Sequence, residues 1–263
     1  MSAYIIAVGD EILSGRVLDY NSHWISKRLT SLGFKIIRRS VIPDDVNEIA
    51  EEINNAFKKG AKIIVLIGGL GPTPGDITLE GVAKAIGKKL ILNETALEYV
   101  KRRYEELCKL GLVRASDISE PRRKMAYLPE GAEPIYNAVG AAPGVFIRLD
   151  NAIILCLPGP PQEAFYVFEQ VVPKLIALKE RTYTASRTIY IEEIDETTVA
   201  DILKKVSEMF PDVYIKTFPT GFGKRMEVTA IATGKDKKEV EEKVEKAINE
   251  FLRLYNERKG LSK

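Results

Sequence analysis

The segment from Lys62 to Thr78, KIIVLIGGLGPTPGDIT, constrains the fold of this chain more than any other part of the sequence. The apolar run IIVLI is typical of a strand that is buried on both faces, as strands are in a parallel sheet. The glycine- and proline-rich loop after it lets backbone N–H groups approach an anion, and a helix beginning beyond the loop adds its positive dipole end. The segment therefore predicts a phosphate-binding loop at the carboxyl end of a buried strand.

Strand-like and helix-like segments alternate along residues 1–178, which is the order expected of a parallel sheet wrapped by helices. Near residue 180 the pattern changes to a β-α-β-β-α order that continues toward the end of the chain. We therefore predict two parts, a large α/β domain over residues 1–178 and a small α+β module over residues 179–263.

The composition argues against several classes of protein. The chain has 39 Lys and Arg residues against 37 Asp and Glu, and its net charge of +2 offers no electrostatic argument for nucleic acid or for an anionic membrane. No apolar run approaches the roughly 20 residues of a transmembrane helix, and no signal-peptide layout precedes the first strand. Cys108 and Cys156 are far apart in the sequence and support neither a disulfide framework nor a zinc site. We expect a soluble, cytoplasmic protein with no membrane partner.

Three unusual loops each follow a predicted strand: Gly9-Asp10-Glu11, Gly68 to Asp76, and Pro158-Gly159-Pro160-Pro161. The carboxyl ends of parallel strands share one edge of an open sheet, and ligands bind there where the strand order reverses. The three loops together therefore predict a binding site at that edge.

Each loop also has a purely structural interpretation. Asp10 and Glu11 could simply form a turn and do no more. Asp76 could simply cap the following helix. The prolines of LPGPP could simply begin a helix, without a role in binding. The loop GGLGPTPGD matches neither GxGxxG nor the P-loop pattern ending in Gly-Lys-Ser/Thr, which argues against a dinucleotide-binding fold and against a kinase.

Four motifs together resemble the CinA family in order and approximate spacing: GDEILSGRVLDYNS at residues 9–22, GGLGPTPGDIT at 68–78, LPEGAEPIYNAVGAAPGV at 128–145 and LPGPPQE at 157–163. Over about residues 3–178 the chain resembles the amino-terminal, molybdopterin-binding-like domain of those proteins, which is related to the MogA and MoeA enzymes of molybdenum cofactor synthesis. The resemblance implies a three-layer α/β/α fold with a mostly parallel sheet, and a nucleotide or pterin pocket along the edge identified above. Residues 179–263 resemble the small KH-like module that follows in many CinA proteins.

The resemblance also implies a function. Members of the family are associated with metal-dependent hydrolysis of the pyrophosphate of ADP-ribose, which implies a hydrolase that uses Mg²⁺ or a similar ion on ADP-ribose or a related dinucleotide. Two alternatives stay open: molybdopterin binding or processing in molybdenum cofactor biosynthesis, and a nucleotide-binding or sensing protein without turnover. Many relatives carry a further nicotinamide mononucleotide deamidase domain, which we expect to be absent because the sequence stops at Lys263. Related proteins form oligomers, which implies a homodimer or a higher homo-oligomer.

A mechanism follows as a hypothesis. Asp76 and Lys124 are the expected catalytic residues, and Lys124 would neutralise a diphosphate held by backbone N–H groups of the glycine loop. Asp76 with Asp10 or Glu11 would hold the divalent cation, which activates a water for attack on phosphorus. The residues expected to bind nucleotide or phosphate are Gly9, Gly68, Gly69, Gly71, Pro72, Thr73, Thr78, Asn137, Gly140, Gly144, Pro158, Gly159 and Pro160.

The chain departs from the family pattern in three places. Gly75 stands where many relatives have an acidic residue next to the equivalent of Asp76. The loss of this acidic side chain concerns the pyrophosphatase activity that the resemblance implies. Met125 stands where glutamine is common, and Ala138 and Ala141 replace a proline and a threonine, which bears on ligand specificity.

We expect no nucleic-acid partner for the carboxyl-terminal module. KH domains bind single-stranded RNA through a GXXG loop between helices, whereas the comparable segment here, residues 221–225, lies between two predicted strands. The near-neutral charge agrees with this. We expect the module to cover the pocket or to form a dimer interface.

Overall fold

The computed structural model describes residues 1–177, 183–193, 195–219 and 225–260. The chain divides into two compact units, Met1–Leu178 and Lys179–Lys263. Each unit has a hydrophobic core of its own. In the described part of the chain, no helix has the length and apolar character needed to span a membrane.

A six-stranded sheet in the order β2-β1-β3-β8-β7-β6 forms the centre of the first unit. The first four strands in this order are parallel to one another, β7 pairs antiparallel with β8, and β6 pairs antiparallel with β7. The strands are β1 (Ser2–Val8), β2 (Lys35–Ile42), β3 (Ile63–Ile67), β6 (Glu133–Ile135), β7 (Gly144–Arg148) and β8 (Ile153–Leu157), and a separate antiparallel pair consists of β4 (Leu90–Leu92) and β5 (Tyr127–Pro129). The predicted α/β fold with a mostly parallel sheet is confirmed.

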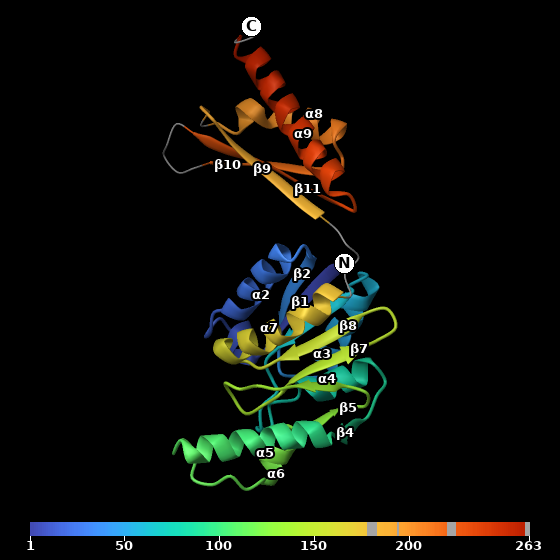
Figure 1. Ribbon diagram of the computed structural model, residues 1–263, viewed down its shortest axis with the longest axis vertical. Helices are drawn as coiled ribbons and strands as arrows, with labels where there is room; N and C mark the ends of the chain where they lie inside the picture. The colour runs from blue at the N-terminus through green and yellow to red at the C-terminus, as the bar shows by residue number, and fades with distance from the viewer. Residues whose placement is uncertain (178–182, 194, 220–224, 261–263) are drawn as a thin grey trace. The chain divides into compact units, whose positions relative to one another are not determined.

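Helices cover both faces of this sheet and make three layers (Figure 1). Alternate residues of β1 and β3 point to opposite faces, so that Ile6 and Leu66 belong to one core and Ile5 and Val65 to the other. The first core includes side chains of α3 (Val46–Lys58), α4 (Thr78–Ala85) and α5 (Glu94–Lys109). The second includes side chains of α2 (Tyr20–Ser31) and α7 (Pro161–Ala177).

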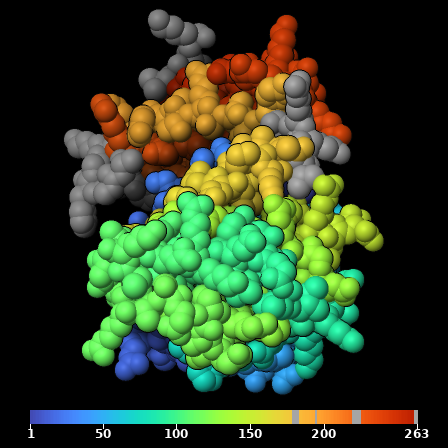
Figure 2. Space-filling model, turned by 60° about the horizontal axis from the view of Figure 1, so that its bottom comes forward, coloured from blue at the N-terminus to red at the C-terminus, as the bar shows by residue number. Residues whose placement is uncertain are grey.

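Two short helices complete the first unit, α1 (Asp10–Leu13) after β1 and α6 (Glu120–Lys124) after α5. Helix α5 buries its first turns through Ala96 and Val100. Its outward face is exposed and covers much of the front of the unit in Figure 2, where it is green.

The second unit is a three-stranded antiparallel sheet, ordered β10-β11-β9, with two helices. Its elements are β9 (Tyr183–Ile191), α8 (Thr197–Met209), β10 (Val213–Pro219), β11 (Met226–Gly234) and α9 (Lys237–Arg258). One face of the sheet packs against both helices through residues such as Val228, Val206 and Phe251. Residues 221–224, on which the argument against RNA binding depends, lie outside the described residues.

Candidate functional site

A cavity of about 670 Å³ lies at the carboxyl ends of β1, β3 and β8. β1 leads to β2 on one side and β3 is followed in the sheet by β8 on the other, so the strand order reverses between β1 and β3. The cavity is therefore at the topological switch point. Its lining includes these residues expected to bind ligand: Gly9, Glu11, Gly68, Gly69, Gly71, Pro72, Thr73, Asp76, Pro158, Gly159 and Pro160.

Close backbone contacts explain the glycine after β3. Gly68 has φ +106°, which side chains disfavour, and a Cβ there would lie 2.4 Å from the carbonyl oxygen of Val8. Its N–H donates to the carbonyl of Leu157 at 3.0 Å. Gly68 thus joins the ends of all three strands, which brings the loops together.

Thr78 fixes the base of the glycine loop and does not contact the cavity. Its side chain is buried, and its hydroxyl donates to the carbonyl of Gly68 at 2.8 Å. A Cβ at Gly69 would lie 2.3 Å from that hydroxyl oxygen. In this structure the Thr78 hydroxyl is therefore engaged within the loop, and Thr78 is not among the residues that line the main cavity.

Asp76 braces the tip of the same loop. One carboxylate oxygen accepts from the backbone N–H of Thr73 at 2.8 Å and from its hydroxyl at 2.6 Å. The residue before α4, Ile77, makes no side-chain cap, so Asp76 does not act as a helix cap. Both Thr73 donors that were expected to hold a diphosphate are engaged by Asp76 in this structure.

Lys124 contacts the loop from α6, on the side away from the main cavity. Its ammonium group donates to the carbonyl of Thr73 at 2.6 Å. It lines a second cavity of about 340 Å³, which shares Gly69, Gly71 and Asp76 with the first. Lys124 therefore contacts the loop and lines the second cavity, and it is not among the residues that line the main cavity.

The three predicted metal ligands do not form a ready-made metal site. Within the residues that the structure describes, no three His, Cys, Asp or Glu side chains are grouped to hold an ion. Asp10 lies in α1, where its backbone N–H donates to Asp44 at 3.1 Å, and Glu11 folds back over Gly9. In the described part of the chain, Asp10, Glu11 and Asp76 are therefore not preassembled as a three-ligand cluster, and their role as metal ligands stays a prediction.

Asp44, which directly follows β2 and Pro43, is a site residue that the sequence reasoning missed. It lines the main cavity, and burial together with the negative charges of Asp10, Glu11 and Asp76 raises the pKa of its carboxyl. The available signal was its position after a strand, since residues there share the edge of the other loops.

The cavity lining is acidic. Among its described lining residues there is no Lys, Arg or His, whereas five carboxylates are present: Glu11, Asp19, Asp44, Asp76 and Glu163. An anionic ligand placed here would meet uncompensated negative charge unless a cation or protons came with it.

Asn137 uses all its side-chain hydrogen-bonding capacity within the protein. It is 1% exposed, and its amide nitrogen donates to the carbonyl of Ala142 at 2.9 Å and to Glu163 at 2.7 Å. Its amide oxygen accepts from the N–H groups of Val139 and Gly140. Asn137 therefore organises a loop, residues 137–142, that supports the site.

Gly140 and Gly144 likewise make close contacts within the protein that leave no room for a side chain. A Cβ at Gly140 would lie 1.8 Å from a carboxylate oxygen of Glu163. Gly144 is buried in β7, and a Cβ there would lie 2.2 Å from Val167 of α7. Neither glycine lines the cavity.

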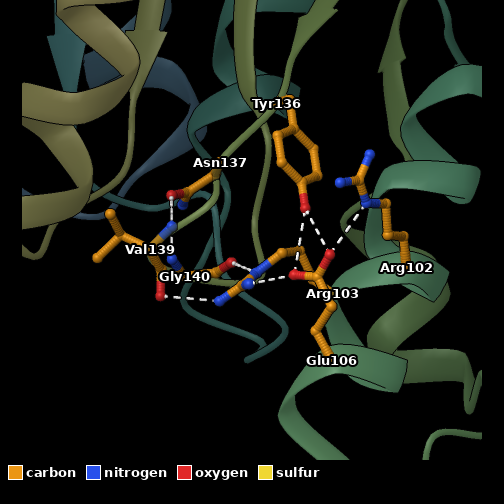
Figure 3. Close-up of polar contacts among 7 residues, drawn as sticks. All are labelled: Arg102, Arg103, Glu106, Tyr136, Asn137, Val139 and Gly140. Atoms are coloured by element: carbon orange, nitrogen blue, oxygen red, sulfur yellow. Dashed lines mark hydrogen bonds and ion pairs between the residues drawn. The ribbon is translucent and has the colours of Figure 1, made fainter.

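Arg103 holds the 137–142 loop from α5 (Figure 3). Its guanidinium donates to the carbonyls of Gly140 at 2.8 Å and Val139 at 3.1 Å, although the residue is only 7% exposed. Glu106, which also accepts from Arg102 and Tyr136, pairs with the same guanidinium. Sequence reasoning missed Arg103, because nothing on a polar helix separates a buried arginine from its exposed neighbours.

Glu163 accepts a hydrogen bond from Asn137 of the 137–142 loop and also lines the cavity. It lies in the first turn of α7, lines the cavity and is half-buried. Burial raises the pKa of its carboxyl, while the hydrogen bond from Asn137 and the charge of Arg103 oppose the shift. The prolines before it do begin a helix, as the structural interpretation held, and they also line the cavity.

Comparisons with known proteins agree with this architecture. A family model described as a probable molybdopterin binding domain matches residues 4–177. Protein PH0439 of Pyrococcus horikoshii is 43% identical over 232 residues, which are 88% of this chain and 89% of that protein. Protein SSO0103 of Saccharolobus solfataricus is 36% identical over 98% of this chain and 93% of its own length.

A solved structure extends the comparison. The crystal structure of the protein CinA, of unknown function, from Thermoplasma acidophilum is 34% identical, with a TM-score of 0.60. The similarity covers 66% of this chain and 99% of that one. The chain therefore belongs to the probable molybdopterin binding domain family and is a CinA-like member of it.

Proposed function

We propose that the first unit binds a phosphate-bearing nucleotide or pterin in the main cavity and, together with a divalent cation, hydrolyses the pyrophosphate of ADP-ribose or a related dinucleotide. The observation that carries the proposal is the cavity lining. Backbone N–H groups of a glycine loop and several carboxylates converge at the switch point, with no basic side chain among the described lining residues.

The carboxylates fit a hard divalent cation that is shared with the ligand. Mg²⁺ is usually bound by one or two carboxylates plus substrate phosphates and waters, and not by a cage made wholly of protein groups. Asp44 and Asp76 both line the cavity and are close enough for their charges to interact. One or both would hold the cation, which neutralises the phosphates and activates a water.

The residues of the chain would then perform three tasks. The N–H groups around Gly69 and Gly71 bind phosphate oxygens, and Thr73 joins them once its donors leave Asp76. Where Asp76 alone holds the cation, Asp44 on the cavity lining would take the proton of the attacking water. The bond from phosphorus to the bridging oxygen breaks, the oxygen keeps the electron pair, and two phosphomonoesters leave.

Molybdopterin is the second candidate ligand. The match of residues 4–177 to a probable molybdopterin binding domain favours it. Its phosphate would use the same glycine loop as the phosphates of a nucleotide.

Asp76 offers the sharpest test. Asp76→Ala removes both the charge and the brace on Thr73, whereas Asp76→Asn keeps an oxygen that can accept both Thr73 hydrogen bonds. We expect Asp76→Asn to lower Mg²⁺-dependent turnover of ADP-ribose about 100-fold or more, and Asp76→Ala to lower it at least as much. Phosphate release and product chromatography measure this, and circular dichroism confirms the fold.

Calorimetry with ADP-ribose and with molybdopterin separates the candidates. Tight binding of ADP-ribose without product under any divalent metal would replace the hydrolase with a sensing protein. Unchanged turnover in Asp76→Asn would overturn the catalytic assignment. Gly75→Asp restores the acid that many relatives have, at a site where the nearest atom to a new Cβ is 3.9 Å away, and we expect it to raise turnover.

A further inference from the structure

One segment of the main cavity's lining carries large apolar side chains that are exposed to solvent. Ile12, Val17, Leu18 and Tyr20, from this single segment after β1, all line the cavity. Leu18 is 84% exposed, Tyr20 51% and Val17 47%. Large apolar side chains gathered in solvent beside a polar cavity mark a surface that a ligand covers.

An aromatic stack stiffens this segment from behind. The ring centroids of Tyr20 and Phe165 are 5.9 Å apart, and Phe165 stacks on Trp24 with a centroid distance of 4.0 Å. Trp24 in turn meets the buried Phe168 edge-on at 6.0 Å. Since each ring is packed against the next, Tyr20 is a supported platform with few conformations to lose when another ring stacks on it.

The next residue, Asn21, supplies a polar group beside the platform. Its amide nitrogen donates to the carbonyl of Gly159 at 2.7 Å, which ties α2 to the proline loop after β8. Its amide oxygen is buried and accepts from no group in the described part of the chain, although Asn21 lies on the cavity lining. A buried acceptor without a donor is unfavourable. This oxygen is closed to solvent, so a ligand N–H would reach it once the amide turns toward the cavity, and that hydrogen bond would remove the penalty.

We infer that Tyr20 and Asn21 form a subsite for the planar nitrogen heterocycle of the ligand. The ring stacks on Tyr20, one of its N–H groups donates to the amide oxygen of Asn21, and the phosphates extend to the glycine loop. The inference rests on the proposed function, because it places the other end of the same ligand. A purine of a nucleotide and the pterin of molybdopterin share this chemistry.

The test compares ligands that have the ring with ligands that lack it. Dissociation constants are measured by calorimetry with Mg²⁺ for the methylene-bridged analogue of ADP-ribose, which is not hydrolysed, and for inorganic pyrophosphate. Molybdopterin is measured under anaerobic conditions. Tyr20→Ser should weaken binding of the ring-bearing ligand about 10- to 100-fold, the size of one ring stacked on an aromatic side chain. Tyr20→Phe should keep wild-type affinity, and pyrophosphate binding should change less than about twofold.

A matched control is Tyr190→Ser in β9, since Tyr190 is 61% exposed and lies outside the first unit. It should leave all affinities unchanged. Equal loss of pyrophosphate and ring-bearing ligand in Tyr20→Ser, no loss of either, or loss in Tyr20→Phe would each overturn the subsite. Failure of the wild-type chain to bind pyrophosphate, the ADP-ribose analogue and molybdopterin would instead overturn the proposed function. Whichever ring shows the Tyr20 dependence identifies the source of the heterocycle.

Discussion

Two loops of the first unit carry family motifs, but they differ in whether their polar groups are exposed or hydrogen-bonded within the protein. The loop of residues 68–76 is largely exposed at its tip, and its residues line the main cavity. The loop of residues 137–142 directs its amide and carbonyl groups inward, to Asn137 and Arg103. The second loop also lines the cavity, through Ala141 and Ala142, and it hydrogen-bonds Glu163 through Asn137. The proposed function assigns the phosphate contacts to the first loop.

The difference is one of burial. Polar groups that lose water must find protein partners, and removing one partner of a buried pair costs far more than removing an exposed one. Asn137 is 1% exposed with four hydrogen bonds, so it is committed to the fold. Thr73 is exposed, so its bonds to Asp76 can be exchanged for bonds to a ligand.

The largest effect on stability should come from the inner loop. Asn137→Ala leaves several buried partners without hydrogen bonds, and we expect it to lower the free energy of unfolding by about 2–4 kcal/mol. Thr73→Val removes one exposed hydroxyl bond and should cost less than about 1 kcal/mol. Urea unfolding measures both. Equal costs for the two variants would show that the loops do not differ as described.

An intermediate effect should follow from adding a methyl group to each loop. In Gly140→Ala the new Cβ would meet the Glu163 carboxylate, so we expect a loss of about 1–3 kcal/mol. In Gly75→Ala the space is open, and stability should stay within about 0.5 kcal/mol of wild type.

A double-mutant cycle tests whether the Glu163 carboxylate causes the loss of stability in Gly140→Ala. In a Glu163→Ala background the cost of Gly140→Ala should fall by at least half, because the clashing carboxylate is gone. An undiminished cost would mean that backbone strain, and not Glu163, requires the glycine.

The smallest effect is the pH dependence that Glu163 contributes. Its folded pKa is raised above the ordinary 4.5 by burial, so its contribution favours the folded state most below that pH and declines as pH rises through the folded pKa. Glu163→Gln should remove this decline, which is below about 1 kcal/mol after solvent screening. Unfolding at pH 4 to 8 measures the difference.

The decline of stability with pH should be steeper in Asn137→Ala, because the Asn137 hydrogen bond opposes the rise of the Glu163 pKa. A shallower decline in that variant would contradict the role given to Asn137.

Much of the fold was predictable because periodicity and breakers are local signals. The run IIVLI is β3, buried at every position, and the glycine and proline loops do meet at one edge. The internal contacts of Asn137, Gly140, Gly144 and Thr78 were not predicted, since a motif does not reveal which of its residues face inward, and the ligand contacts expected of them stay predictions. The oligomeric state and the location in the cell stay predictions.

The sequence by itself determined a parallel α/β sheet with three special loops at the strand ends, and through its motifs the family. Alternation of elements and turn chemistry are properties of neighbouring residues, so they can be read along the chain. Only the tertiary structure decided that Asp44 and Glu163 join the cavity, that Arg103 supports Glu163 from behind, and that Tyr20 rests on Phe165. These pairings join residues far apart in the chain, and packing and burial, not local propensity, determine them.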